Sequence, residues 1–505
     1  MWSIILTLTA ITVGLYLFAE LNALYRIYRY KKQGLKHTVY LPLPVAFYFM
    51  NKLMQSDDIY SGVKDQMNEQ DPEQPFNVMN VGSKCYLTLI SEKAIKEFYA
   101  KETEVTIKEN ILGKVKFLGF FFQNGKDVEE KRALFAKIFH YSNVLGLMPA
   151  MRNVVKQHVI KLKKRAEAAG GQVKIDMKKE FSRDLFDDLS ACILFQGAEK
   201  KIVDTFEGLT ITQIISKMVN LFLDSQFNIV NQLPFVNALG LNKEVNELVR
   251  LKNGLKGIIR KEYNKRYNDK NLDDKSVLDI MVKINKESEK ETGKPKFTVE
   301  EISSNFEIFQ LAASDTSFHL SSTTLTYVAL PENQQYQKRI QGEIDSSLKT
   351  SDSYSNDQLN ALKEVDLVFK EANRLATPAS LISRAVTKDF KLDGYQIYKG
   401  DEIRNALINY QPEYFKDPYK FNPDRFNPQS EDFTTVPKLK HIPFSHGKRA
   451  CVGKYLGEMM VKLIVVELLR ELDLSVEKGF VMKFSQDPLY GVKNPELIVK
   501  VKGSD

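Results

Sequence analysis

The sequence predicts a mainly α-helical body with small β-sheets, preceded by a single N-terminal transmembrane helix. Three observations support this fold class. Residues 2–19 are apolar or small and carry no charge. No proline occurs between Thr298 and Pro331, and this stretch predicts an unusually long helix. Clear strand patterns are confined to short segments, such as 76–91 and 389–407, so the sheets should be small.

The uncharged segment 2–19 is about long enough to cross a bilayer as a helix. Basic residues follow it and none precedes it; they are Arg26, Arg29, Lys31 and Lys32. Because basic flanks stay in the cytosol, the bulk of the chain should face the cytosol. A cleaved signal peptide is the alternative, but its apolar region would be shorter and would follow a basic start. We therefore expect a membrane anchor with its flank at 1–35, a body at 36–505, and a single-pass membrane protein.

Composition excludes several classes of protein. With 43% hydrophobic and 27% charged residues, the chain should be globular. Its net charge of +8 is spread along the chain, which suits an acidic protein partner or an anionic membrane surface better than nucleic acid. The three cysteines, Cys85, Cys192 and Cys451, lie far apart and form no CxxC pair. They predict neither a disulfide framework nor a zinc site.

Local signals place several helix ends. Thr298 followed by Glu301 forms a capping box, which predicts the start of the long helix. A second helix is expected over 357–375, because the residue before Pro378 disfavours helical geometry. The proline-rich segment 411–440 should be irregular. The body should therefore combine long helices with an extended, loop-rich stretch before Cys451.

The stretch PFSHGKRACVGKYLGE, residues 443–458, raises the question of what Cys451 does. A helical pattern begins just after this cysteine, so its thiolate would lie at the positive end of a helix. Arg449 adds positive charge, and both effects should lower the pKa of the cysteine. Gly447 and Gly453 permit tight turns and leave the approach to the sulfur open. A small buried cysteine is the alternative.

The whole stretch resembles the haem-binding signature of the cytochrome P450 superfamily, of the membrane-anchored, eukaryotic microsomal type. Its fixed positions are Phe444, Gly447, Arg449, Cys451 and Gly453. The resemblance implies the cytochrome P450 fold, with the haem-thiolate catalytic domain at 36–505 in the cytosol and the anchor in the endoplasmic reticulum. It also implies that the thiolate of Cys451 is the axial ligand of haem b, and that O2 binds on the opposite face of the iron.

Two further motifs follow the order of that family. Glu371 and Arg374 lie three residues apart, and Arg425 stands in PDRF at 423–426. The resemblance implies a buried network of these three side chains that supports the cysteine loop. Losing one member of such a network should be severe.

The motif LAASDTS at 311–317 resembles the oxygen-activation motif of the family. Ala312 and Ala313 would let the helix pass close to the haem, although glycine is more usual at the second position. Asp315 and Thr316 would deliver protons to bound oxygen. An amphipathic helix with small packing residues and polar surface residues is the alternative.

Three arginines are expected to bind the haem propionates, because the guanidinium group suits carboxylates. Arg132 takes the family position of an arginine four residues after a tryptophan, although Val128 stands in place of that tryptophan. Arg384 takes a second family position, and Arg449 is the third candidate. Each could instead be an ordinary surface arginine.

Aromatic and apolar residues indicate a lipophilic substrate. Phe117, Phe120 and Phe121 precede the helix of Arg132, where the family has a loop over the pocket, and plain core packing is the alternative. Leu489 and Tyr490 are further pocket candidates by family analogy. The resemblance implies a sterol, a fatty acid or another small apolar molecule.

The resemblance implies a monooxygenase that inserts one atom of O2 into this substrate. The sequence contains no dinucleotide fingerprint and no iron–sulfur motif, so electrons should come from NADPH through a separate reductase of the cytochrome P450 reductase type. Lys131, Lys137 and Lys448 could steer such an acidic partner, or could simply be solvated. Two alternatives are a reductase-independent isomerase or dehydratase of the same family, and a non-catalytic haem-binding sensor. We expect lipid as a further partner, and no nucleic acid.

Overall fold

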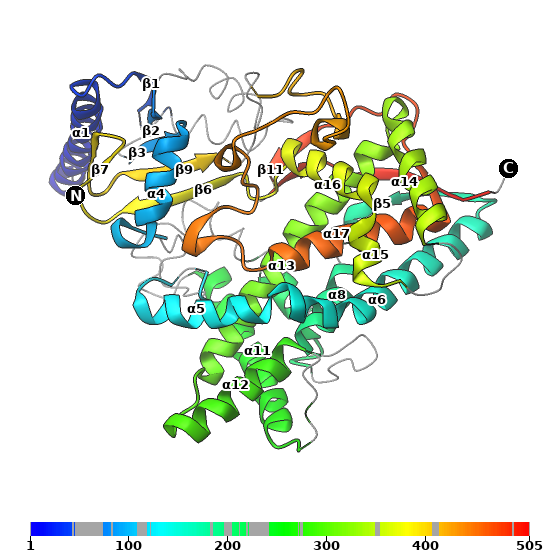
Figure 1. Ribbon diagram of the computed structural model, residues 1–505. Helices are drawn as coiled ribbons and strands as arrows, with labels where there is room; N and C mark the ends of the chain where they lie inside the picture. Colours follow the sequence, from blue (N-terminus) through cyan, green and yellow to red (C-terminus); the bar gives the residue numbers. More distant parts are fainter. Residues whose placement is uncertain are drawn as a thin grey trace.

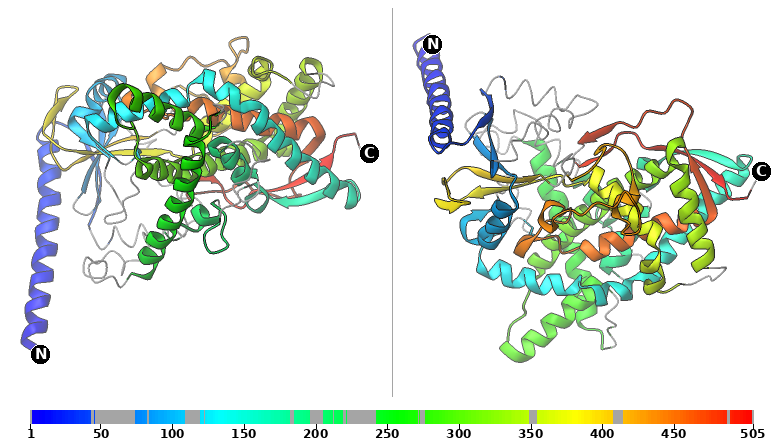
Figure 2. Two further views of the ribbon diagram at one scale, coloured as in Figure 1. Left: turned by 90° about the horizontal axis from the view of Figure 1, so that it is seen from below. Right: turned by 45° about the horizontal axis from the view of Figure 1, so that its top comes forward.

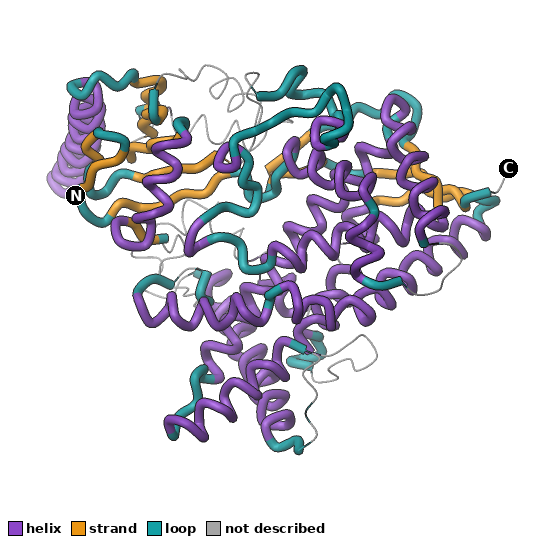
Figure 3. Tube along the Cα trace, viewed as in Figure 1, coloured by secondary structure: helices purple, strands orange, loops and turns teal. Residues whose placement is uncertain are grey.

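The computed structural model is a mainly helical body with small sheets, which confirms the fold class predicted for the body (Figure 1, Figure 3). The residues that the structure describes are 2–42, 45, 74–81, 84–108, 119–121, 123–181, 185–195, 205–211, 213–218, 221, 242–270, 272, 276–348, 354–406, 414–486 and 489–503. Phe117 lies outside them, and its predicted place near a pocket stays a prediction.

A run of helices in the middle of the chain lies between two groups of elements that contain the strands. The α-helices are α1 (Trp2–Lys31), α4 (Glu92–Val105), α5 (Lys126–Ile138), α6 (Tyr141–Ala168), α7 (Met177–Glu180), α8 (Phe186–Phe195), α11 (Lys243–Tyr267), α12 (Val277–Thr292), α13 (Val299–Ala329), α14 (Gln334–Ser347), α15 (Asn356–Ala361), α16 (Lys363–Leu375) and α17 (Lys454–Glu471). The strands are β1 (His37–Leu41), β2 (Phe76–Val81), β3 (Lys84–Leu89), β4 (Thr106–Ile107), β5 (Gln172–Asp176), β6 (Leu381–Val386), β7 (Phe390–Leu392), β8 (Tyr395–Ile397), β9 (Glu402–Ala406), β10 (Leu472–Ser475), β11 (Phe484–Gln486), β12 (Tyr490–Val492) and β13 (Glu496–Val501).

Helix α13 is the long central helix that the sequence predicts. Thr298 caps it: its hydroxyl accepts the N–H of Glu301, whose carboxylate accepts the N–H of Thr298 in return. The helix ends before Pro331, as expected. It packs against α8, α11, α14, α16 and α17, so it runs through the middle of the helical body (Figure 1).

The predicted helix over 357–375 is two helices in the structure. Helix α15 ends at Ala361 and α16 begins at Lys363, with Leu362 extended between them. The carboxylate of Glu343, on the neighbouring α14, accepts the N–H groups of Lys363 and Glu364 at 2.6 and 2.9 Å. A side chain from another helix therefore satisfies the first turn of α16, which no local pattern could reveal.

Within the described residues the strands form four sheets. The largest has the order β1-β2-β3-β9-β6-β4, and the β2–β3 pair confirms the hairpin predicted at 76–91. The pair β7–β8 turns at Asp393 and Gly394, both with positive φ, as the predicted hairpin at 389–407 requires. The end of that segment, β9, pairs instead with β3 and β6.

Buried apolar side chains of the described residues form two clusters. The larger one surrounds α13, α17 and α6. The smaller one lies between α4 and the six-stranded sheet and includes Cys85 and Tyr30, the latter from α1. The cysteine loop 443–453 touches α4 through Gly447–Arg449, so it lies where these two parts of the body meet.

Helix α1 projects from the body at the β1–β3 end of the large sheet (Figure 2). Among the helices of the described residues, none combines enough length with enough apolar character to cross a membrane. The prediction of a transmembrane helix at the N-terminus is therefore not confirmed.

The cap of α13 gives a first test. We expect Thr298→Ala to lower the free energy of unfolding by about 1 kcal/mol, because an N–H group of the first turn loses its acceptor. Thr298→Ser keeps the hydroxyl and should stay close to the parent. Urea unfolding followed by circular dichroism measures both. Equal losses in the two variants would contradict a role for the hydroxyl.

Candidate active site

The cysteine loop is held by its own backbone. Cys451 lies just before α17, whose N-cap is Gly453. The N–H of Cys451 donates to the carbonyl of Phe444 at 2.9 Å, which closes the loop, and the N–H of Gly453 donates to the Cys451 sulfur. Ser445 and Gly447 both have positive φ, at 63° and 74°. At Gly447 a Cβ would also come within 3.2 Å of the Tyr99 ring, so glycine fits this position on two counts.

Tyr99, on α4, supports this loop, and the sequence analysis missed it. Its hydroxyl lies 3.1 Å from the Ser445 hydroxyl and accepts the side-chain N–H of Asn405 at 2.9 Å. Its ring meets His446 edge to face, with centroids 5.5 Å apart. Tyr99 thus joins the loop to both α4 and β9.

The Cys451 side chain is accessible but deep. The side chain of Cys451 has solvent-accessible surface, yet protein atoms surround it closely. Burial raises the pKa of the Cys451 thiol, and this outweighs the Gly453 N–H and the positive charges of Arg132 and Lys108. The prediction that its pKa falls is therefore wrong for the side chain by itself, because desolvation dominates. A thiolate here needs a further cation.

Several residues of the predicted oxygen-activation motif on α13 have solvent-accessible surface. Ala312 is exposed and Ala313, Asp315 and Thr316 are half-buried, whereas Ser314 and most of the helix are buried. The Thr316 hydroxyl donates to the carbonyl of Ala312 at 2.6 Å. Burial raises the pKa of Asp315 to about 6, partly offset by Lys178, so its carboxyl can hold a proton close to neutral pH.

The three predicted arginines come together from three separate elements. Arg132 lies on α5, Arg384 on β6 and Arg449 in the cysteine loop, and all three are buried. Lys108, which follows β4, joins them. Burial and then the three neighbouring arginines lower its pKa well below the usual lysine value. Burial and Arg449 likewise lower the pKa of Arg132 to about 10.

Backbone carbonyls take up part of this positive charge. Arg132 donates from Nη2 to the carbonyl of Ala450 at 2.6 Å, next to the cysteine. Arg449 donates to the carbonyls of Phe120 and Gln123 at 3.0 and 2.6 Å. These bonds tie the cysteine loop to α5 and to the segment before α5.

The acidic neighbour common to Lys108, Arg132 and Arg449 is Glu102, on α4. Its carboxylate accepts the Nε–H of Arg384 at 2.7 Å and is buried. Glu129 is a second, partly exposed carboxylate near Arg449, so the four cations still outnumber the acidic groups around them. Lys108 could not be found from sequence, because a lone lysine beside an apolar loop is ordinary.

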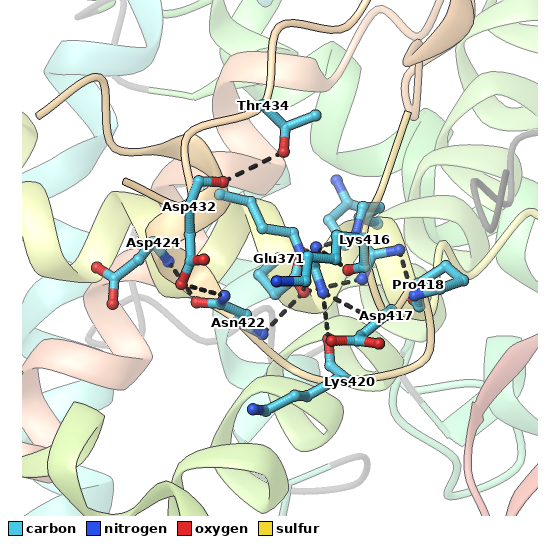
Figure 4. A network of polar contacts seen from close by, with 12 residues as sticks. Glu371, Lys416, Asp417, Pro418, Lys420, Asn422, Asp424, Asp432 and Thr434 are labelled. Atoms are coloured by element: carbon cyan, nitrogen blue, oxygen red, sulfur yellow. Dashed lines mark hydrogen bonds and ion pairs between the residues drawn. The ribbon is translucent and has the colours of Figure 1, made fainter. Parts of the chain in front are cut away.

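Glu371, Arg374 and Arg425 meet in a fully buried network (Figure 4). Two nitrogens of Arg374 donate to the two oxygens of Glu371 at 2.7 and 2.8 Å. Arg425 donates to the same carboxylate at 3.2 Å, and the N–H of Asn422 donates to it at 2.9 Å. The carboxylate on α16 is thereby saturated with donors.

The two arginines also hold the loop-rich segment that leads to Cys451. Arg374 donates to the carbonyl of Pro418 at 2.8 Å. Arg425 donates to the carbonyls of Lys416, Asp417 and Lys420. Figure 4 shows Lys416, Asp417, Pro418 and Lys420 close to Glu371. The segment 414–425 therefore wraps around charge carried by α16.

The predicted pocket residues lie in different surroundings. Phe120 is buried, and its ring packs against Phe135 with centroids 5.0 Å apart, in the larger core. Tyr490 is also buried and stacks on Phe484 at 5.2 Å. Core packing, the alternative weighed for the phenylalanines, describes Phe120. Phe121 is exposed, with the Lys108 amine 3.5 Å from its ring centroid, and Leu489 is half-buried.

Comparison with known protein families identifies the family of this chain. The family model described as Cytochrome P450 matches residues 41–501. The chain belongs to the cytochrome P450 family. Members of this family bind haem b and use O2, with electrons from NAD(P)H supplied through a reductase. The recognition made from the cysteine signature is thereby confirmed.

Individual relatives are distant and share part of their length. A sterol 14α-demethylase of Mycolicibacterium vanbaalenii is 32% identical over 210 residues, which cover 41% of this chain and 45% of the relative. Cytochrome P450 26B1 of Rattus norvegicus is 28% identical over 350 residues, 67% of this chain and 62% of the relative. Cytochrome P450 9e2 of Blattella germanica is 30% identical over 191 residues, 36% and 35% of the two chains. Each match thus spans less than two thirds of the relative.

The residues fit haem b. Arg132 and Lys108 do not offset the burial of the Cys451 sulfur, and a haem iron would supply the positive charge that a thiolate needs there. The excess positive charge of Lys108 and the three arginines matches the two propionates of this cofactor. Small side chains on α13, at Ala312 and Ala313, leave room for a flat group.

The Glu371 network gives a second test. We expect Glu371→Gln to lower the free energy of unfolding by about 3–5 kcal/mol, because Arg374 and Arg425 stay buried without their counter-charge. Glu471→Gln is the control, since Glu471 pairs with Lys163 at 2.8 Å in a largely exposed place and should change stability by at most about 1 kcal/mol. Urea midpoints and the yield of folded protein measure both. Similar losses in the two variants would contradict the importance of the network.

Proposed function

We propose that this protein is a haem-thiolate monooxygenase, which inserts one atom of O2 into a lipophilic organic substrate. The observation that carries the proposal is the place of Cys451. Its sulfur has exposed surface although protein surrounds it closely, and it lies beside three buried arginines and the half-buried Lys108. The acidic neighbours of these four cations are Glu102 and Glu129. A buried thiol and excess positive charge together suit an iron porphyrin with two carboxylates.

The cysteine loop would hold and orient the cofactor. Cys451 supplies the axial thiolate, and the N–H of Gly453 stabilises its negative charge. Nothing lies within 4 Å of a Cβ built on Gly453, so this position leaves space over the loop. Phe444 lies half-buried at the loop's start, and its carbonyl fixes the backbone of Cys451. Gly447 makes the turn that brings these residues together.

The four cations would receive the propionates. Arg132, Arg384, Arg449 and Lys108 already converge, so little reorganisation is needed on binding. Neutralising the cluster also removes the repulsion that lowers the pKa of Lys108. Cofactor binding should therefore stabilise the folded protein strongly.

Asp315 and Thr316 would manage protons on the opposite side. When bound, the haem binds and activates O2. The carboxyl of Asp315 holds a proton close to neutral pH, and the Thr316 hydroxyl can pass one on, since it can donate and accept at once. The bond from Thr316 to the Ala312 carbonyl keeps this hydroxyl close to α13.

Electrons would come from NADPH through a separate reductase. Lys137 on α5 and Lys448 in the cysteine loop are exposed, and Lys448 lies 3.8 Å from Glu129. Lys131 pairs more closely, with Glu301 at 2.6 Å and with Asp127 at 3.2 Å. We expect the first two lysines to steer an acidic partner, with a rate that falls as salt rises. Lys131 contributes less, because its charge is already compensated.

A lipid membrane would be the second partner. Apolar side chains of the N-terminal half of α1 are exposed, and a basic cluster ends this helix. This pattern supports attachment to the cytosolic face of the endoplasmic reticulum, with α1 as the anchor. A membrane-held enzyme takes its substrate from lipid, so a sterol, a fatty acid or another apolar molecule fits. One relative carries the name sterol 14α-demethylase. Leu489 and Phe121 are accessible enough to touch such a substrate.

The carbon monoxide difference spectrum tests the axial ligand. We expect the reduced protein, expressed in membranes, to give the strongly red-shifted Soret band of thiolate-bound haem. Cys451→Ser should abolish this band. Cys192→Ser is the matched control, because Cys192 is buried on α8, and it should leave the band unchanged. Haem with no red shift in the parent would contradict thiolate ligation, and folded protein without haem would overturn the proposal.

Reconstitution separates the monooxygenase from its rivals. Product formation should require the reductase and NADPH. Conversion of a hydroperoxide without reductase would indicate an isomerase or dehydratase, and NADPH consumption without product across many lipophiles would indicate a sensor. The retained pair of Asp315 and Thr316 favours the monooxygenase, because proton delivery to oxygen is what these residues can supply.

The raised pKa of Asp315 predicts a pH-dependent stability. Between its usual value and about 6, the folded state binds a proton that the unfolded state has lost, so Asp315 lowers stability as pH rises through this window. We expect Asp315→Asn to be more stable than the parent at pH 7 and no more stable near pH 4. Glu431→Gln, at an exposed carboxyl, should show no such crossover. Urea midpoints across this range measure the difference, and a constant offset would contradict the shift.

A further inference from the structure

Helix α1 has two halves with different surroundings. Its C-terminal half packs onto the large sheet, where Ala23, Ile27 and Tyr30 are buried. Its N-terminal half extends beyond the body (Figure 2), and apolar side chains there are at least half exposed. The exposed residues begin in this half and continue past the midpoint of the helix; they are Ile11, Val13, Leu15, Leu17, Phe18 and Leu21.

The exposed apolar side chains point in many directions. At about 100° per residue, the positions from Ile11 to Leu21 spread over more than half of the helix circumference. A helix that packs on one protein partner needs an apolar stripe of roughly 100°. A surface this wide fits a continuous apolar solvent better than a groove. Lys31 and Lys32, both exposed at the C-terminal end, fit the headgroups at its boundary.

A single buried carboxylate holds α1 to the body. Asp401, just before β9, has no exposed surface. It accepts from Arg26 Nη1 at 2.6 Å and from the Tyr30 hydroxyl at 2.6 Å, and Arg29 lies 3.5 Å away. These three partners belong to consecutive turns of α1. Asp401 therefore fixes the helix at more than one point along its axis.

Neighbouring contacts remove the remaining freedom of the helix. Arg26 also donates to the carbonyl of Gly400 at 2.8 Å, and Arg29 lies over the Tyr398 ring at 3.9 Å. Gln33 and Gln396 exchange two hydrogen bonds, at 2.6 and 3.1 Å. The last turns of α1 and the residues directly after it are thus bonded to the β8–β9 connection. These contacts oppose rotation of the helix relative to the body.

We propose that α1 inserts its N-terminal half into a lipid bilayer while Asp401 locks its C-terminal half, so that helix and body form one rigid unit. The bilayer then sets the tilt of the catalytic body. The β1–β3 end of the large sheet, which α1 touches, faces the lipid surface. The lipid partner rests on the proposed membrane attachment, whereas the Asp401 lock rests on the contacts described above.

Distances between two spin labels test the lock. Nitroxides are placed at Ala10→Cys on α1 and Lys96→Cys on α4, both exposed positions, in the full haem-loaded chain in nanodiscs of phosphatidylcholine and phosphatidylserine. Pulsed electron paramagnetic resonance should give one narrow distance distribution. We expect Asp401→Asn to broaden it at least twofold. Arg26→Gln, which leaves the sheet unchanged, should broaden it similarly.

Asp345→Asn is the matched control, because Asp345 pairs with Lys502 at 2.9 Å on an exposed surface. It should leave the distribution narrow. A parent distribution as broad as that of the Asp401 variant would overturn the lock, as would a narrow distribution in both lock variants. The parent without introduced cysteines measures any labelling of the native ones.

Quenching of tryptophan fluorescence tests the lipid partner separately. Trp2 is the single tryptophan of the chain and lies at the start of α1. Brominated phosphatidylcholine in the same nanodiscs should quench Trp2 in the parent and in Asp401→Asn alike. Absence of quenching in the parent would overturn the lipid partner, while the lock can still be measured in detergent. The carbon monoxide spectrum of the same samples reports independently on the proposed enzyme.

Discussion

The carboxylate of Glu371 is the interaction on which the site most depends. It is fully buried, and it balances two buried guanidinium groups, Arg374 and Arg425. Charges in such a place are stable only when every hydrogen-bonding group is satisfied. The arginines meet this condition by binding the carbonyls of 416–420, so the irregular segment before Cys451 takes its shape from them. Charge compensation on α16 thus positions a loop that has little regular structure.

The cysteine site itself shows the opposite balance. Four cations outnumber their acidic neighbours Glu102 and Glu129, and the burial of the Cys451 sulfur outweighs the positive charges near it. A folded protein tolerates such an imbalance at a functional site, where a ligand completes it. A porphyrin with an iron cation and two carboxylates would satisfy both deficits at once. The network at Glu371 is complete in the protein alone, which fits a structural role for it and a binding role for the cation cluster.

Asp401 repeats the principle of Glu371 at the other end of the molecule. In both places one buried carboxylate joins distant segments through arginine side chains, here α1 and the turn before β9. Asp401 lies just before β9 of the six-stranded sheet, and Glu371 lies on α16 of the helical body. The orientation of α1 and that of the cysteine loop therefore both depend on a buried carboxylate that is paired with arginine side chains.

The sequence by itself determined the features that local contacts encode. The capping box at Thr298, the length of α13, the two hairpins and the signature around Cys451 all depend on residues a few positions apart. Tertiary structure decided what depends on distant residues. Arg26 and Asp401 lie 375 positions apart. Lys108 entered the cation cluster, Glu343 divided a predicted helix, Phe120 packed into the core, and burial raised the pKa of Cys451. Desolvation and charge compensation arise only when such segments meet, so no local pattern could reveal them.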